Sequence, residues 1–274
     1  MTLTGDGVLF LAGVGNMGQA LLAGWLARGL DPTRVVVQDP APSAQGMALL
    51  ARHGITAHAS ITSLPEPPAV IVLAVKPQVM DEVLPPLAPL AGTNTVVLSI
   101  AAGRTIAGIA RHLADGCAVI RAMPNTPAAV GRGIAVAVAN PHVTAGQRAH
   151  CDGLLRAVGD VAWVAQEDLL DAVTAVSGSG PAYVFYLTEC LAEAGRRVGL
   201  APELAERLAR ATVAGAGELL HHSALGAETL RQNVTSPNGT THAALTVLMA
   251  DEGLGKLMRE AVAAATKRSQ ELAS

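Results

Sequence analysis

The sequence predicts an α/β domain with a mostly parallel sheet over residues 1–164, followed by an all-helical domain over residues 165–274. Short apolar runs rich in β-branched residues alternate with longer helical patterns in the first half, and these strand signals stop after about Trp163. From Leu169 onward the pattern is helical almost to the end. Continuous apolar strands separated by helices are typical of a parallel sheet covered on both faces.

Each expected element has a recognisable beginning and end. The expected strands are 8–12, 35–38, 70–75, 95–100, 118–122 and 134–139, and the helices between the first of them are 17–28 and 44–53. Gly29 and Gly54 stop these two helices, as a C-terminal glycine commonly does. In the helical half we expect interruptions at 178–181, 199–202, 223–226, 236–239 and Gly253.

The composition indicates a globular chain whose core is built from small aliphatic side chains. Half of the 274 residues are hydrophobic, 15% are charged and only 2% are aromatic. The helical half has only about 110 residues, so its own core is expected to be marginal. Pairing of helices between two copies would bury more, and the small residues Ala192, Gly195, Gly215 and Gly217 favour such close packing.

Charge and cysteine usage exclude several classes of protein. A formal net charge of -3 gives no electrostatic footprint for nucleic acid. No stretch reaches the roughly 18 uninterrupted apolar residues of a spanning helix. Cys117, Cys151 and Cys190 are far apart and lack metal-ligand spacing, so we expect buried thiols in a reducing compartment and no metal site. Met1–Asp6 lacks the basic region of a signal peptide, and we therefore expect a cytoplasmic protein.

The strongest local motif lies near the N-terminus. Gly13, Gly15 and Gly18 form G-x-G-x-x-G between the strand expected at 8–12 and the helix expected at 17–28. The first glycine permits a tight turn, the second lets the backbone approach a pyrophosphate, and the third allows close packing of helix on strand. Because the motif has both of its expected flanks, it predicts a dinucleotide site at the helix N-terminus.

Asp39 supports two interpretations that the sequence leaves about even. It ends the second strand about 20 residues past Gly18, where an acid commonly bonds a ribose 2′-hydroxyl and would repel a 2′-phosphate. On that interpretation it favours NAD over NADP. Alternatively, Asp39 only starts a turn before Pro40.

Two further segments have the composition of helix N-termini. Ser177–Pro181 precedes a helix expected near Ala182, and its run of serine and glycine suggests close approach by a ligand or by another chain. Ser236–Thr241 precedes a helix expected from His242 and offers backbone amides and hydroxyls at the positive end of its dipole. Such a segment can hold a small carboxylate, although an ordinary loop and cap would have the same composition.

Five segments, in this order and spacing, resemble the 1-pyrroline-5-carboxylate reductase family, and the resemblance covers nearly the whole chain. They are G-V-G-N-M-G at 13–18, A-V-K-P at 74–77, M-P-N-T-P at 123–127, S-G-S-G-P-A-Y at 177–183 and V-T-S-P-N-G-T-T at 234–241. The last segment is the most specific. It departs from the family at Asn238, where glycine is usual, but asparagine also tolerates left-handed backbone angles.

The resemblance implies a Rossmann-type dinucleotide-binding domain followed by an all-α dimerisation domain. It implies reduction of 1-pyrroline-5-carboxylate to L-proline with NADPH or NADH, the last step of proline biosynthesis, by a homodimer that in the family often joins a ring of dimers. Thr241 would reach the imine nitrogen as the catalytic residue, and Ser236, Gly239 and Thr240 would hold the substrate carboxylate. The cofactor-binding residues implied are Gly13, Gly15, Asn16, Met17, Gly18, Ala74, Val75, Lys76, Pro77, Ala101, Ala102, Gly103 and Asn233.

Reduction of a C=N bond needs a hydride at carbon and a proton at nitrogen. The nicotinamide would supply the hydride, and a hydroxyl such as that of Thr241 could orient or relay the proton. Alternatively, Thr241 is a helix-start residue that bonds its own backbone. His242 is treated as an exposed helix residue, because the family motif does not require it.

Two other functions are weighed against the reductase. A β-hydroxyacid dehydrogenase also joins a dinucleotide domain to a helical half. Enzymes of that family resemble one another in carrying a catalytic lysine in the helical half. Here no lysine lies between Lys76 and Lys256, which counts against that function. A non-catalytic redox sensor would bind the dinucleotide but would have no need of a carboxylate site at Ser236–Thr241.

Overall fold

The computed structural model describes residues 7–273. Met1–Asp6, on which the expectation about a signal peptide rests, lies outside the described residues. The described chain forms two compact units, one made of the residues up to Gly178 with those from Thr266 onward, and one of Ser179–Ala265. The sequence places its domain boundary earlier, between residues 164 and 165.

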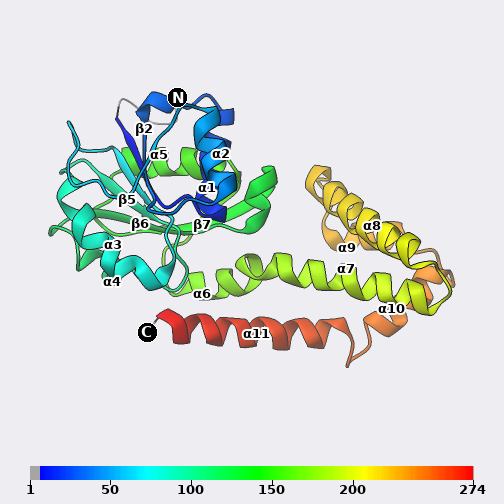
Figure 1. Ribbon diagram of the computed structural model, residues 1–274. Helices are drawn as coiled ribbons and strands as arrows, with labels where there is room; N and C mark the ends of the chain where they lie inside the picture. Colours follow the sequence, from blue (N-terminus) through cyan, green and yellow to red (C-terminus); the bar gives the residue numbers. More distant parts are fainter. Residues whose placement is uncertain (1–6, 274) are drawn as a thin grey trace. The chain divides into compact units, whose positions relative to one another are not determined.

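Within residues 7–273, eight strands form a single sheet in the order β3-β2-β1-β4-β5-β6-β7-β8 (Figure 1). Neighbouring strands pair in parallel except β6 and β7, which are antiparallel, so the expectation of a mostly parallel sheet is confirmed. The strands are β1 (Leu9–Ala12), β2 (Val35–Gln38), β3 (Ala57–His58), β4 (Val70–Leu73), β5 (Val96–Ser99), β6 (Ala118–Met123), β7 (Gly133–Ala139) and β8 (Gly159–Trp163).

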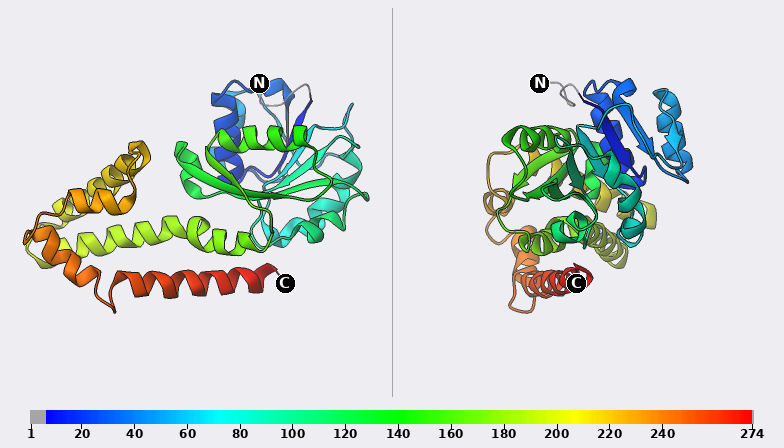
Figure 2. Two further views of the ribbon diagram at one scale, coloured as in Figure 1. Left: turned by 180° about the vertical axis from the view of Figure 1, so that it is seen from behind. Right: turned by 90° about the vertical axis from the view of Figure 1, so that its left-hand side faces the viewer.

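Helices cover both faces of this sheet, as Figures 1 and 2 show. On one face, Leu22 and Trp25 join a core that also includes Leu50 and Leu154. On the other face, Met80 and Ile109 pack in a second core. The α-helices of this part are α1 (Asn16–Ala27), α2 (Ala44–Arg52), α3 (Met80–Leu87), α4 (Ile106–Ala110) and α5 (Ala145–Arg156), with short 3-10 turns η1 (Pro32–Arg34), η2 (Pro77–Val79), η3 (Ala88–Leu90) and η4 (Thr126–Val130).

Strands β3 and β8, at the two edges of the sheet, were not expected from the sequence. β3 has only two residues, and β8 begins with a glycine and an aspartate and alternates exposed with buried positions. Neither has the continuous apolar run that marks a central strand, because an edge strand needs only one buried face.

The helical part consists of α6 (Leu169–Val173), the π turn η5 (Thr174–Gly178), α7 (Gly180–Arg197), α8 (Pro202–His222), α9 (Ala227–Asn233), α10 (Thr240–Leu248) and α11 (Leu254–Ala273). All five expected interruptions fall between these elements. The one expected at 178–181 is a short break at Ser179, where the π turn ends and α7 begins while the backbone stays in the right-handed helical region.

Helices α7 and α8 pack on each other but leave large apolar side chains uncovered. Ala192 is buried and a Cβ at Gly195 would lie 3.2 Å from the Cβ of Ala205, so these two small residues serve the α7–α8 contact within one chain. The expectation that they face a second copy is therefore wrong, whereas Gly215 and Gly217 have open space around them. Among residues 7–273, no helix is both long and apolar enough to cross a membrane.

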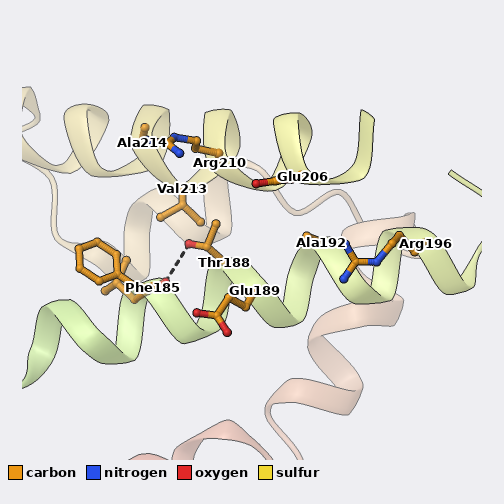
Figure 3. Close-up of a pocket in the computed structure, with 10 residues that line it drawn as sticks. Phe185, Thr188, Glu189, Ala192, Arg196, Glu206, Arg210, Val213 and Ala214 are labelled. Carbon is orange, nitrogen blue, oxygen red and sulfur yellow. Dashed lines mark hydrogen bonds between the residues drawn. The ribbon is translucent and has the colours of Figure 1, made fainter. Parts of the chain in front are cut away.

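Between α7 and α8 lies a groove of about 680 Å³ (Figure 3). Phe185, which is 62% exposed, and Val213 give it an apolar wall, and Thr188 turns its hydroxyl to the carbonyl of Val184, 2.8 Å away. The charged residues Glu189, Arg196, Glu206 and Arg210 also line the groove, so its apolar wall is bordered by charge.

The three cysteines are free thiols, and they differ in burial. Cys151 is fully buried, and burial raises the pKa of its thiol to about 12. Cys117 is half-buried, and Cys190 on α7 is exposed. The expectation of three buried thiols is wrong for Cys190, because its helix face has no cover within a single chain.

We predict that the chain sediments as a dimer or a larger assembly at micromolar concentration. Phe185→Lys should weaken association by at least about a hundredfold, since two copies would each lose roughly 1.5–3 kcal/mol of apolar burial. Val130→Lys, at a 76% exposed apolar residue of the sheet-bearing unit, is the matched control and should leave the assembly unchanged. A stable folded monomer of the wild-type chain would contradict this prediction.

Candidate active site

The turn between β1 and α1 is tightly packed at two of its three motif glycines. Gly13 has φ +96°, and a Cβ there would lie 2.8 Å from the carbonyl oxygen of Ala74. A Cβ at Gly18 would lie 2.3 Å from the carbonyl oxygen of Gly13. At Gly15, by contrast, a Cβ would meet nothing within 4 Å. The chain itself therefore demands glycine at 13 and 18, whereas the open space at Gly15 is available to a ligand.

The first backbone amides of α1 lie beside this open space. Gly15 is the N-cap residue, and no side chain caps the helix. Among residues 7–273, the backbone amides of Asn16, Met17 and Gly18 have no acceptor. Three such amides at the positive end of a helix dipole are suited to an anion such as a pyrophosphate.

Asp39 lies beside this turn and is bonded by it. One carboxylate oxygen accepts a hydrogen bond of 2.7 Å from the amide of Val14, and the other accepts one of 2.9 Å from the amide of Ala41. The second bond is the one that a turn-starting aspartate makes. The first bond fixes the glycine turn, a role that the sequence did not indicate. Each oxygen keeps a lone pair with which it could bond a hydroxyl, so both sequence interpretations remain compatible with this geometry.

Two more predicted segments follow neighbouring strands at the same edge of the sheet. Ala74–Pro77 comes after β4, and Ala101–Gly103 comes after β5, the strand beside it. Lys76 is exposed, so its amine is not buried in the protein. Because β2 and β4 lie on opposite sides of β1, the glycine turn stands where the strand order reverses, which is where parallel α/β sheets bind dinucleotides.

Met123–Pro127 has a structural role that the sequence did not indicate. Asn125, which is 9% exposed, donates from Nδ2 to the carbonyl of Ser177 at 3.2 Å and accepts from the amide of Ile134 at 3.0 Å. A Cβ at Gly178 would lie 2.6 Å from Cε of Met123. The backbone of Ser177 and the position of Gly178 thus contact the end of β6, which accounts for the glycine at 178 in Ser177–Pro181.

The loop before α10 is preformed by contacts within its own unit. Asn238 has φ +58°, the one positive φ of a non-glycine residue among residues 7–273, as expected from its tolerance of that region. Gly239 lies close to Ser236, since a Cβ there would lie 3.2 Å from the carbonyl oxygen of Ser236 and would displace its hydroxyl. Among residues 7–273, the amides of Thr240, Thr241 and His242 have no acceptor. Asn233 and Ser236 are exposed, and Thr241 is half-buried.

A buried ion pair near the end of β6 escaped the sequence analysis. The side chain of Arg121 is 5% exposed, and its Nη1 lies 2.9 Å from Oε1 of Glu167. The same oxygen accepts a hydrogen bond of 2.8 Å from the amide of Ile106, the first residue of α4. The signal was present, since an arginine within an otherwise apolar strand must find a carboxylate or remain in solvent.

Known proteins resemble the chain over almost its whole length. Residues 167–272 match the family model described as pyrroline-5-carboxylate reductase dimerisation, and residues 7–103 match one described as NADP oxidoreductase, coenzyme F420-dependent. The pyrroline-5-carboxylate reductase of Pseudomonas aeruginosa is 40% identical over 95% of each chain. The chain belongs to the pyrroline-5-carboxylate reductase family. The resemblance stated from its motifs is thereby confirmed, and neither a β-hydroxyacid dehydrogenase nor a redox sensor is favoured.

Solved reductases of the family share the fold of the whole chain. A pyrroline-5-carboxylate reductase from Coxiella burnetii aligns with a TM-score of 0.90 at 35% identity, covering 98% of this chain and 99% of that one. The Plasmodium falciparum enzyme, solved with NADP bound, aligns with a TM-score of 0.82 at 27% identity, covering 99% of this chain and 100% of that one. The Rossmann-type domain followed by a helical dimerisation domain is confirmed as the fold class.

We predict that Gly15→Ala abolishes dinucleotide binding and leaves the fold intact. The added methyl group meets no protein atom within 4 Å but fills the space that a pyrophosphate would approach. Gly18→Ala is the contrasting variant, because its Cβ would overlap the carbonyl of Gly13 and should lower the thermal midpoint of unfolding. A dinucleotide titration and a thermal melt separate the two effects. Wild-type affinity in folded Gly15→Ala would remove this turn from the site.

Proposed function

We propose that this protein reduces 1-pyrroline-5-carboxylate to L-proline with a hydride from NADH or NADPH, the last step of proline biosynthesis. The observation that carries the proposal is the preformed loop Ser236–Thr241, with its unpaired amides, in a chain that aligns with reductases of this family from end to end. Steady-state oxidation of NADH and NADPH in the presence of the imine tests it directly. Absence of turnover with NADH and with NADPH would refute the proposal.

The sheet-bearing unit would hold the cofactor. The amides of Asn16, Met17 and Gly18 would bind the pyrophosphate, with Gly13 and Gly15 shaping the turn. The adenosine would lie toward β2, where Asp39 and Thr56 line a cavity of about 330 Å³. The nicotinamide would then lie on the opposite side of β1, toward the backbone segments Ala74, Val75, Lys76, Pro77 and Ala101, Ala102, Gly103, with Asn233 as a further cofactor ligand.

The loop before α10 would hold the substrate carboxylate. Ser236 offers a hydroxyl, and the backbone at Gly239 and Thr240 offers the amide of Thr240 at the positive end of the α10 dipole, since the amide of Gly239 donates to the carbonyl of Ser236 at 3.1 Å. A carboxylate held there is fixed by charge-assisted hydrogen bonds without a buried cation. Its position would set the orientation of the imine ring.

Thr241 would serve the proton side of the reaction. Thr235 and Thr246 donate their hydroxyls to backbone carbonyls four residues earlier, at 2.6 and 3.0 Å. Among residues 7–273, the hydroxyl of Thr241 has no such acceptor, so it is available to the imine nitrogen. The bound nicotinamide supplies the hydride, and Thr241 would orient the nitrogen or relay a proton to it.

The proposal includes a homo-oligomer in the cytoplasm. The dimerisation model matches residues 167–272, which supports a homo-oligomer, and we propose a homodimer that joins a ring of dimers. We place the protein in the cytoplasm, where the nicotinamide cofactors are available and free thiols such as those of Cys117, Cys151 and Cys190 persist.

For Asp39 we predict a preference for NADH. A carboxylate beside the adenosine ribose would bond its 2′-hydroxyl and repel a 2′-phosphate. Asp39→Ser should lower the ratio of kcat/KM for NADH to that for NADPH by roughly tenfold or more, because both effects act in the same direction. An unchanged ratio would show that Asp39 only fixes the turn through Val14 and Ala41.

For the substrate loop we predict that Ser236→Ala raises KM for the imine much more than it lowers kcat. Loss of a hydrogen bond to a charged group costs about 1.5–3 kcal/mol, roughly a tenfold to hundredfold effect. Thr241→Ala should instead lower kcat, because its hydroxyl would meet a nitrogen whose charge changes during the reaction.

Thr241→Ser is the matched control for Thr241→Ala, because it keeps the hydroxyl and should retain most of the activity. Equal losses in the two variants would assign the effect to packing of the methyl group. A wild-type kcat in Thr241→Ala would exclude this residue from the proton step.

A further inference from the structure

The loop Ala101–Thr105, between β5 and α4, is fixed from several directions by its own unit. The amide of Ala101 donates to Oγ of Ser99 at 3.3 Å. Arg104 forms an ion pair with Asp81 at the start of α3. At the far end of the loop, Ile106 donates its amide to Glu167 at 2.8 Å. A loop with this many attachments has little freedom to move by itself.

The anchor at Glu167 also carries α6. Glu167 lies two residues before Leu169, the first residue of α6, and its partner Arg121 is nearly inaccessible. Leu170 is fully buried and packs with Val136 and Val138 of β7. The N-terminal end of α6 is therefore packed against the sheet, and Glu167, just before that end, bonds the loop.

The last turns of α11 join this arrangement from the other end of the sequence. Ser269, which is 7% exposed, donates its hydroxyl to Oδ1 of Asp171 in α6 at 2.6 Å. Gly103 has φ +71°, and a Cβ there would lie 3.2 Å from the carbonyl oxygen of Leu272 and 3.5 Å from its Cβ. The C-terminal end of α11 thus lies beside α6 and against the backbone of the Ala101–Thr105 loop (Figure 1).

We propose that the C-terminal turns of α11, fixed by the Ser269–Asp171 hydrogen bond, position the Ala101–Thr105 loop for the nicotinamide end of the cofactor. This inference rests on the proposed function, which assigns that loop to the cofactor. Since β5 lies on the opposite side of β1 from β2, the loop faces the nicotinamide half and not the adenosine half. Ser269 and Asp171 are positioning residues, because they act through Leu272 and Gly103.

Because the loop is assigned to the nicotinamide half, its displacement should affect the whole dinucleotide but not a fragment that lacks the nicotinamide. Ser269→Ala should weaken binding of the preferred dinucleotide by roughly threefold to tenfold, the effect of one neutral-donor hydrogen bond expressed through the loop. It should leave the affinity for the corresponding ADP-ribose unchanged, because that fragment lacks the nicotinamide. KM for the dinucleotide should rise and kcat should fall, whereas KM for the imine at saturating dinucleotide should stay constant.

The experiment compares four full-length variants by titration with both ligands and by steady-state kinetics. Ser269→Thr and Asp171→Asn keep a donor and an acceptor, respectively, and should restore dinucleotide binding toward the wild-type value. Gln270→Ala, at the exposed neighbour of Ser269, should behave as wild type. Equal weakening of dinucleotide and ADP-ribose by Ser269→Ala, or wild-type behaviour of that variant, would overturn the inference. Failure of the proposed function is distinct, because the wild-type protein would then oxidise neither NADH nor NADPH in the presence of the imine, whereas failure of this inference leaves wild-type turnover intact.

Discussion

Backbone segments pack directly against each other where β1 turns into α1, and the arrangement of the proposed cofactor site depends on that close approach. The carbonyl of Ala74 lies beside Gly13, and the carbonyl of Gly13 lies beside Gly18, at distances that exclude any side chain. This packing brings α1 down onto β1 and β4 and aims its N-terminal amides along the carboxyl edge of the sheet. Asp39 completes the turn by accepting the amide of Val14, so the end of β2 is tied to the same point.

From this turn outward, each neighbouring strand contributes a loop that is held by contacts distant in sequence. The loop after β5 is fixed by Glu167 and by Leu272, which lie 61 and more residues away along the chain. The loop after β6 is fixed by Asn125, whose side chain joins Ser177 and Ile134. Residues of the Met123–Pro127 and Ser177–Pro181 motifs therefore join distant segments beside the proposed cofactor site.

The helical unit has the opposite character, since it leaves its apolar surface unfilled. Among the described residues Ser179–Ala265, only the small residues Ala192, Ala205 and Ala209 are buried, whereas Phe185 and Leu191 are exposed. A chain with so few aromatic residues can pack two helices closely through alanine and glycine, but it cannot fill the surrounding space by itself. Association of copies then provides the missing core, in agreement with the dimerisation model that this part of the chain matches.

The sequence by itself determined the central strands, the first two helices and the glycine turn, because hydrophobic periodicity and glycine chemistry are local properties. It also determined the family, through motifs such as Val234–Thr241, and the left-handed backbone of Asn238. Only the tertiary structure decided which partners the polar groups take. The bond from Val14 to Asp39, the burial of Arg121 against Glu167 and the return of α11 to Gly103 all join residues far apart in the chain. No local pattern encodes such pairings, since each depends on how strands and helices are brought together by the packing of the whole unit.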